Sequence, residues 1–186
     1  MITLNNVSFS YGEKQVIRNF SLTINKGHRI CLFGESGCGK TTLLRIILGL
    51  LTPQCGDVKY DKPLKPSIVF QENLLLPFKT VLKNITLFGA ENTKAIELLK
   101  ELDIAEYAES MPSALSGGIE RRVAIARALS YDFDYLCLDE PFTGLDQENI
   151  EKAAKLILKK ASDKPIVLIT HSLEEAELLN AKIINL

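Results

Sequence analysis

Apolar and polar residues alternate strictly in two stretches near the beginning of the chain. Residues 7–11 read VSFSY and residues 20–24 read FSLTI, so every second side chain is apolar. Because successive side chains of a strand point to opposite faces, this period of two gives each stretch one apolar and one polar face. The pattern predicts two half-buried antiparallel strands.

Four other apolar runs show no such alternation. They are short and rich in Ile, Leu and Val, which is typical of strands in a parallel sheet covered on both faces. These runs span residues 29–33, 68–70, 135–138 and 166–169. The sequence AKIINL at residues 181–186 predicts one further strand, after which we expect no C-terminal regulatory domain.

Three stretches have the composition and spacing of helices. Residues 40–51 are apolar nearly all round and predict a buried helix that ends before Pro53. Residues 91–102 and 150–160 each have one apolar face and predict amphipathic helices. Two sheet types with a helical middle predict an α/β fold, in which a parallel core carries an antiparallel β subregion and a small helical subregion.

Length and charge narrow the function classes. A chain of 186 residues forms one domain with a sizeable core. A net charge of −1 argues against a sequence-independent nucleic-acid binder, which needs a basic face, so we expect no nucleic-acid partner. The apolar runs are too short to span a bilayer, and the first residues lack the features of a signal peptide. We therefore expect a cytosolic chain whose thiols are reduced.

The segment GESGCGKT at residues 34–41 has the form G-x-x-x-x-G-K-[ST]. Its glycines allow backbone amides to turn toward phosphate oxygens, and the helix that follows directs its positive N-terminal end at the anion. Lys40 can reach the terminal phosphates, and the Thr41 hydroxyl can bind Mg²⁺. The alternative is a chance Gly-rich turn, but an apolar strand before it and a helix after it favour a phosphate loop. We expect nucleotide contacts from Gly34, Glu35, Ser36, Gly37, Cys38, Gly39, Lys40, Thr41 and Thr42.

Two carboxylates follow the buried run at residues 135–138. Asp139 can hold Mg²⁺ through a water, because Mg²⁺ gives up its waters reluctantly. Glu140 can polarise the water that attacks the phosphate. An ordinary acidic strand end is the alternative, and the phosphate loop in the same chain favours the catalytic interpretation.

The segment LSGG at residues 115–118 precedes a run of helix formers. Ser116 can cap that helix, which is also the purely structural interpretation. In addition, Gly117 and Gly118 leave amides bare for a γ-phosphate. The chain already has its own phosphate loop, so these amides have no obvious anion within the same subunit.

The order of these motifs, a phosphate loop, then LSGG, then LCLDEP, resembles the ATP-binding subunit of an ABC (ATP-binding cassette) transporter. The resemblance runs from about Tyr11 to His171. It implies a P-loop NTPase with a RecA-like parallel core, about 1–72 and 123–186, and a helical subregion with the signature motif, about 73–122. It also implies a head-to-tail dimer in which LSGG closes over ATP held by the partner subunit. Ile119 stands where the family usually has Gln, which puts one side-chain contact in doubt.

Smaller matches follow the family's order. The resemblance implies adenine stacking for Tyr11, a Mg²⁺ and γ-phosphate sensor at Gln71, and a γ-phosphate contact for His171. Asp146 matches the loop that crosses to the other subunit. Taken alone, each of these residues has an ordinary structural interpretation.

Residues 69–85, VFQENLLLPFKTVLKNI, resemble the nitrate/sulfonate/taurine importer branch, which has Trp where Phe78 stands here. The alternative is that these apolar residues only pack the helical subregion. We therefore expect an ATPase that dimerises with a second copy or a paralogous subunit and powers import through an integral membrane permease, at the inner face of the cell membrane. The alternatives are a soluble, non-transport ABC-type ATPase and a P-loop nucleotide kinase, which would not explain LSGG before DEP.

Overall fold

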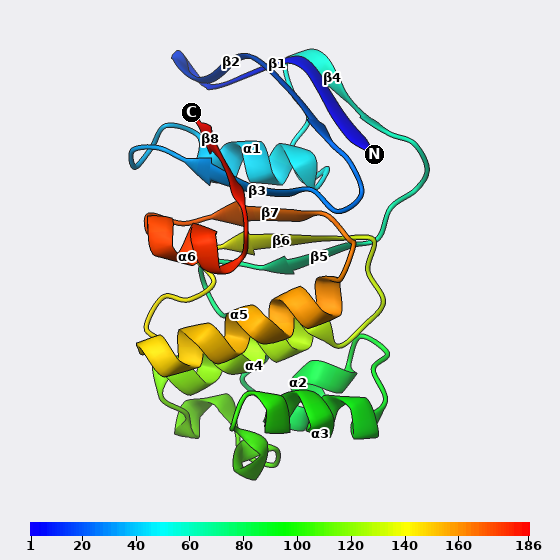
Figure 1. Cartoon of the computed structure of the whole chain (residues 1–186), viewed down its shortest axis with the longest axis vertical. Helices are drawn as coiled ribbons and strands as arrows, with labels where there is room; N and C mark the ends of the chain where they lie inside the picture. The colour runs from blue at the N-terminus through cyan, green and yellow to red at the C-terminus, as the bar shows by residue number, and fades with distance from the viewer.

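The strands form two separate sheets in the computed structural model, which describes all residues from 1 to 186 (Figure 1). One sheet has three strands in the order β2-β1-β4. Its strands β1 (Ile2–Tyr11) and β2 (Lys14–Ile24) run antiparallel, with Tyr11 opposite Lys14 at the hairpin end. The two antiparallel strands predicted from alternation are therefore confirmed.

The second sheet has five strands in the order β5-β6-β7-β3-β8, and all of its pairings are parallel. Strands β6 and β7 are buried along their whole length, as their unbroken apolar runs predicted. The strands are β3 (Arg29–Phe33), β5 (Pro66–Val69), β6 (Tyr135–Asp139), β7 (Ile166–Ile169) and β8 (Lys182–Asn185).

Strand β4 (Cys55–Tyr60) lies in a stretch for which the sequence predicted no element. It pairs antiparallel with β1 at the edge of the three-stranded sheet, and only Val58 and Tyr60 are half-buried. Gly56 has φ +78°, and a Cβ there would lie 2.3 Å from the carbonyl oxygen of Asn5. The strand thus depends on close backbone contact rather than on an apolar face, and leaves little signal in the sequence.

Helix α1 (Lys40–Ile47) is shorter than the predicted helix over residues 40–51. Gly49 adopts φ +72°, and the amides of Leu50 and Leu51 both bond to the carbonyl of Arg45. Glycine in this left-handed conformation ends a helix readily. The apolar run continues past the glycine, so hydrophobicity alone placed the end too late.

The two predicted amphipathic helices are present. Helix α3 (Asn92–Glu101) agrees with the expected stretch, whereas α5 (Gln147–Ala161) begins three residues earlier than expected. The side chain of Asp146 caps α5 by accepting a hydrogen bond from the Asn149 amide, which fixes the earlier start. The other helices are α2 (Val81–Thr86), α4 (Gly117–Leu129), α6 (Leu173–Leu178) and the 3₁₀ turns η1 (Ala105–Tyr107) and η2 (Pro112–Ala114).

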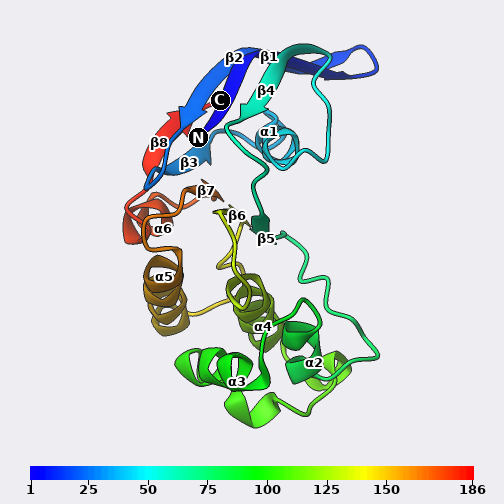
Figure 2. The same ribbon diagram turned by 90° about the vertical axis from the view of Figure 1, so that its right-hand side faces the viewer.

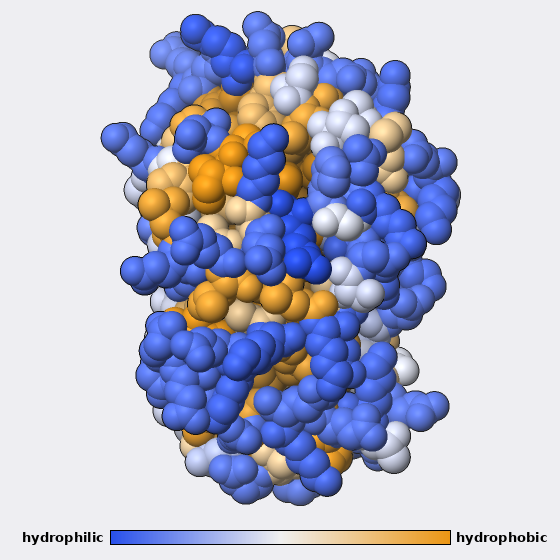
Figure 3. All heavy atoms as spheres, viewed as in Figure 1, coloured by the Kyte–Doolittle hydropathy of each residue, from blue (hydrophilic) through white to orange (hydrophobic).

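The parallel sheet separates two apolar cores. Along β6, Leu136 and Leu138 belong to the core shared with α3, α4 and α5, while Tyr135 and Cys137 face the core shared with α1 and the three-stranded sheet. Figure 2 shows α1 and the antiparallel sheet on one side of the parallel sheet, α4 and α5 on the other, and α2 and α3 farthest from it. On the face drawn in Figure 3 this helical end is mostly hydrophilic. None of the helices has the length and apolarity needed to span a bilayer.

Candidate functional site

The loop between β3 and α1 folds tightly around its glycines. Gly37 has φ +81° and Gly39 has φ +109°, conformations that L side chains rarely adopt. A Cβ on Gly39 would lie 2.8 Å from the carbonyl oxygen of Val16 and 2.7 Å from Cδ1 of Ile17. Only glycine therefore allows this loop to pack against β2.

Lys40 begins α1 and is 6% exposed. Its Nζ donates hydrogen bonds of 2.8 Å to the carbonyls of Gly34 and Glu35, and the Cys38 Sγ lies 4.0 Å away. The ammonium thus faces the inside of the loop. Together with the N-terminal end of α1, it gives this part of the site a positive potential that suits phosphate.

Asp139 ends β6 and is 4% exposed. Its Oδ2 accepts a hydrogen bond of 3.3 Å from the Thr41 hydroxyl, which joins the strand end to the phosphate loop. Burial raises the pKa of Asp139, and the Thr41 hydrogen bond and the charge of Arg121 work against that rise.

Glu140 follows in the left-handed region, with φ +49°. Its Oε1 is buried and accepts no hydrogen bond, although the Nε2 of His171 lies 3.2 Å away. Burial raises the pKa of Glu140, and His171 partly opposes the rise. A carboxylate with a free buried lone pair is well suited to accept a proton from water.

These groups share one cavity of about 520 Å³, a size typical of small-molecule sites. The sequence did not predict four of its lining residues: Lys14, Val16, Thr143 and Ile169. Lys14 and Val16 lie on the hairpin arm opposite Tyr11, outside the alternating stretches at residues 7–11 and 20–24, so the alternation gave no signal for them. The predicted residues that line the cavity are Tyr11, Ser36, Gly37, Gly39, Lys40, Thr41, Thr42, Gln71, Asp139, Glu140 and His171.

Other predicted residues lie outside this lining. Gly34, Glu35 and Cys38 belong to the loop but do not line the cavity. The carbonyls of Gly34 and Glu35 accept hydrogen bonds from Lys40, and that of Glu35 also accepts one from the Cys38 amide. Ser116 and Gly117 are exposed, and the Ser116 hydroxyl accepts a hydrogen bond of 3.4 Å from the Ile119 amide. The predicted helix cap is therefore confirmed.

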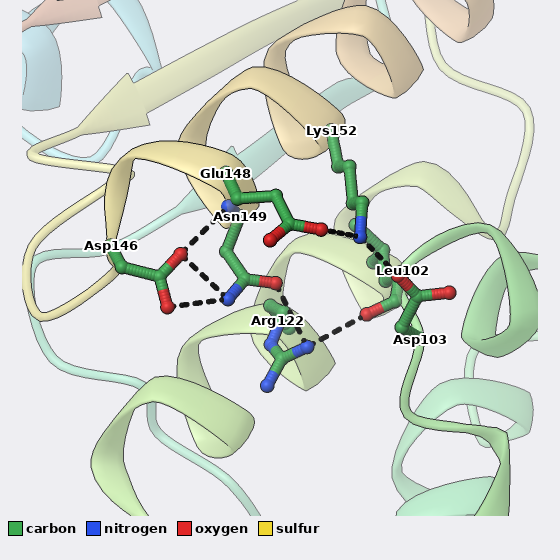
Figure 4. A network of polar contacts seen from close by, with 7 residues as sticks. All are labelled: Leu102, Asp103, Arg122, Asp146, Glu148, Asn149 and Lys152. Atoms are coloured by element: carbon green, nitrogen blue, oxygen red, sulfur yellow. Dashed lines mark hydrogen bonds and ion pairs between the residues drawn. The ribbon is translucent and has the colours of Figure 1, made fainter.

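Asp146 also lies outside the lining of the cavity and belongs to a polar network (Figure 4). Hydrogen bonds from Asn149 hold the pKa of Asp146 below its usual range. Asn149 in turn accepts a hydrogen bond of 3.0 Å from Arg122, which also bonds to the carbonyl of Leu102 at 3.0 Å. The start of α5 is thus tied to α4 and to the end of α3.

Arg121 is a residue that sequence reasoning missed. It is 2% exposed and bonds to carbonyls at the ends of β5 and β6. Arg121 precedes Ile125 and Leu129 by four and eight residues, which places it on a buried helix face. The signal available in the sequence was a charged residue at a helical position otherwise occupied by buried apolar residues.

Comparison with known proteins gives consistent matches. A family model described as "ABC transporter" matches residues 17–143. An aliphatic sulfonates import ATP-binding protein of Corynebacterium glutamicum is 39% identical, over 94% of this chain and 75% of that protein. One from Paraburkholderia xenovorans is 41% identical, over 94% and 72%. A thiamine import ATP-binding protein of Haemophilus influenzae is 35% identical, over 97% and 91%.

Solved structures agree with these relatives. A dimeric ATP-binding cassette in a post-hydrolysis state with ADP and Pi superposes with a TM-score of 0.88 at 32% identity, over 100% of this chain and 94% of that one. A bacterial Atm1-family ABC exporter with ATP bound gives a TM-score of 0.87 at 26% identity, over 100% and 36%. The predicted P-loop NTPase fold and the resemblance to the sulfonate importer branch are confirmed. The chain therefore belongs to the ABC transporter family, as an ATP-binding, ATP-hydrolysing subunit.

Proposed function

We propose that this chain binds MgATP in the 520 Å³ cavity, closes into a head-to-tail dimer, and uses hydrolysis to drive import through a separate membrane permease. The observation that carries the proposal is that a phosphate loop and the Asp139–Glu140 pair line one cavity, while the LSGG amides lie outside it. Each subunit then has half of a site.

Within the cavity, few residues are available to bind magnesium, and they offer hard oxygen ligands. The Oγ1 of Thr41 lies 3.3 Å from the Oδ2 of Asp139, and Gln71 lines the same cavity. No group of three or more His, Cys, Asp and Glu side chains forms a closed metal site. This donor set fits Mg²⁺, which is usually bound through one or two carboxylates together with substrate phosphates and water.

In the proposed reaction, Glu140 accepts a proton from water as the water oxygen bonds to the γ-phosphorus. The bond from phosphorus to the bridging oxygen breaks, and ADP and phosphate result. Lys40 stabilises the charge on the phosphate oxygens, and the position of His171 Nε2 3.2 Å from Glu140 Oε1 in the same cavity supports a contact of His171 with the γ-phosphate. Tyr11, which also lines the cavity and is half exposed, offers a face for adenine.

The second copy completes the site in this proposal. Ser116 and Gly117 are solvent-exposed at the N-terminal end of α4, a helix of thirteen residues, so their amides are accessible to an anion from outside the subunit. The exposure of Asp146 at the start of α5 supports a contact of this residue with the partner. The similarity to cassettes solved as dimers supports this arrangement.

The permease would dock on the segment that links β5 to α2. Two adjoining cavities of about 250 and 270 Å³ share Ile68, Phe70 and Leu74 as lining residues. Beyond them Leu76 is 39% exposed and Phe78 is 89% exposed. Exposed apolar patches of this kind mark partner surfaces. Because the first cavity also includes Gln71 and Asp139, a partner seated there reaches the nucleotide site. The similar sulfonate importers make a sulfonate permease the partner that we propose.

Replacing Phe78 with Asp should abolish permease binding and leave hydrolysis by the isolated subunit intact. Phe78 is almost fully exposed and lies outside the nucleotide cavity, so its loss removes only partner contacts. Leu173→Asp is the matched control, because Leu173 is also exposed, but on α6 at the other side of the molecule (Figure 2). Co-purification with the permease is the measurement. Equal loss of binding in both variants would contradict the proposed docking surface.

Bound MgATP should slow maleimide labelling of Cys38 and leave labelling of Cys55 unchanged. Cys38 is half-buried inside the phosphate loop, whereas Cys55 is exposed on β4 and serves as the internal control. Cys31 and Cys137 are buried, and burial raises the pKa of the Cys31 thiol to about 11, so neither should react. Peptide mapping after brief labelling decides the matter. Equal protection of Cys38 and Cys55 would place the nucleotide elsewhere.

A further inference from the structure

Arg121 is a cation buried inside the molecule and held almost entirely by backbone carbonyls. It lies in the first turns of α4 and is 2% exposed. Five of its six acceptors are main-chain oxygens, and the sixth is the side-chain oxygen of Asn73. A buried charge is retained only with such compensation, so this arrangement fixes the surrounding backbone strongly.

One side of the guanidinium holds the end of β6. Its Nε donates to the carbonyl of Pro141 at 2.9 Å, and its Nη2 donates to the carbonyl of Asp139 at 3.0 Å and to that of Glu140. Three consecutive peptide groups are thereby bound by one side chain. These are the peptides that carry both carboxylates of the site.

The other side of the guanidinium holds the segment after β5. Its Nη1 donates to the carbonyls of Phe70 at 2.6 Å and Gln71 at 3.2 Å, and to Oδ1 of Asn73 at 3.2 Å. The planar fork of arginine allows these donors to point in different directions at once, which a lysine ammonium cannot reproduce. Arg121 therefore joins the two segments that supply Gln71 and Glu140 to the cavity.

The backbone at Glu140 needs such support. Its φ of +49° is uncommon for a residue with a side chain, and conformations of this kind persist where the surroundings determine them. The Glu140 amide donates to the carbonyl of Ile169 at 2.9 Å, and its carbonyl accepts from Arg121 and from the Thr143 amide. Arg121 is the one side chain in this set, so it is the part that can be changed by substitution.

We propose that Arg121 is a positioning residue for hydrolysis: it holds the Glu140 peptide in the conformation that aims the carboxylate at the attacking water. The inference rests on the proposed role of Glu140 as the proton acceptor. It assigns to the first turns of α4 a role within their own subunit, in addition to the role proposed for LSGG in the partner's site.

The test compares Arg121→Met with Arg127→Met. Arg127 lies on the same helix and holds the same segment after β5, through hydrogen bonds of 2.7 Å to the carbonyls of Asn73 and Leu74, but has no bond to residues 139–141. We expect kcat of Arg121→Met to fall about 10²-fold, the cost of slight misplacement of a reacting group. The Kd for ATP measured without Mg²⁺ should stay within about twofold, because the phosphate loop is untouched and of the residues proposed to bind nucleotide or metal only the Mg²⁺ ligands Gln71 and Asp139 are held by Arg121. The control should keep most of its kcat.

Three results would overturn the proposal: a folded Arg121→Met protein with wild-type kcat, an equal loss in Arg127→Met, or a loss of ATP affinity that parallels the loss of kcat. Thermal unfolding and ATP binding report whether the variants fold. If the Met variant does not fold, the kcat of Arg121→Lys tests the proposal instead. Lysine keeps the charge but cannot hold both segments, so its kcat should be clearly reduced, and a wild-type kcat would overturn the proposal.

A double-mutant cycle with Glu140→Gln separates positioning from general damage. If Arg121 acts through Glu140, adding Arg121→Met to Glu140→Gln should lower the single-turnover rate far less than it does in the wild type. The same factor in both backgrounds would show action independent of Glu140 and sink the inference. Undiminished hydrolysis by Glu140→Gln alone would instead refute the proposed role of Glu140, and this inference with it.

Discussion

Replacing Glu140 with Gln is expected to lower ATP hydrolysis by about 10²- to 10⁴-fold, the range that a positioned general base contributes. Glutamine keeps the shape of the side chain but cannot accept the proton of the attacking water. The hydrogen bonds of Lys40 to the phosphate loop and of Thr41 to Asp139 do not involve Glu140, so ATP affinity should be retained. Phosphate release and equilibrium ATP binding, measured on the same preparation, test both halves of this expectation.

The same variant should accumulate as a closed dimer when ATP is present, because bound nucleotide is no longer consumed. Size-exclusion chromatography with ATP is the measurement. Glu174→Gln is the matched control, since Glu174 is exposed on α6 and does not line the cavity; it should hydrolyse ATP normally and leave no trapped dimer. Only monomer at ATP concentrations far above the Kd would contradict a site shared between subunits.

The pH dependence of the wild type provides a further arm of this test. Burial raises the pKa of Glu140, and a general base must be ionised to act. As pH falls, the rate should therefore begin to drop at a higher pH than it would for an exposed glutamate, whose pKa is about 4.3. If the residual rate of Glu140→Gln shows no such drop at acidic pH, the titration belongs to Glu140.

Much of the fold was predictable because strong periodicity reports burial directly. The unbroken apolar runs that became β6 and β7 are buried on both faces, and the alternating run in β2 has exposed residues at Ser21 and Thr23. The run in β1 departs from this pattern, because register shifts interrupt its pairing, Ser8 is buried and Tyr11 is exposed. Two features were not predictable in this way. Strand β4 is held by close backbone approach at Gly56, and α1 ends at a left-handed glycine within an apolar run.

The site was predictable where a residue acts through its own side chain at a fixed spacing from a motif. Lys40, Thr41, Asp139 and Glu140 meet in one cavity as expected. Arg121 acts on peptide carbonyls that come from two other segments of the chain, and such partners leave no local spacing to detect. The spacing of Arg121 to Ile125 and Leu129 indicates its burial, but only the structure shows which carbonyls it binds.

Replacing Ser116 with Arg should abolish hydrolysis and leave ATP binding by the isolated monomer unchanged. Ser116 does not line the cavity of its own subunit, so the added bulk disturbs only the site of the partner. The substitution also removes the cap of α4, which costs about 1 kcal/mol. Ser116→Ala removes the same cap without adding bulk and should keep substantial activity. Loss of ATP binding by the Ser116→Arg monomer would mean that the motif acts on nucleotide in its own subunit.

Mixing Ser116→Arg with Lys40→Ala protein tests the shared site most directly. Neither variant alone forms an intact site, because every dimer carries the same lesion in both halves. In a mixed dimer one composite site carries both lesions, and the other pairs an intact phosphate loop with an intact LSGG segment. Random pairing in an equal mixture makes half of the dimers mixed, so a quarter of all sites should be restored. Single-turnover cleavage of bound ATP counts these sites without requiring both halves of a dimer to cycle. Recovery supports contribution across the dimer, whereas a mixture as inactive as its components, with mixed dimers shown to form, would place LSGG and the phosphate loop of one chain in the same site.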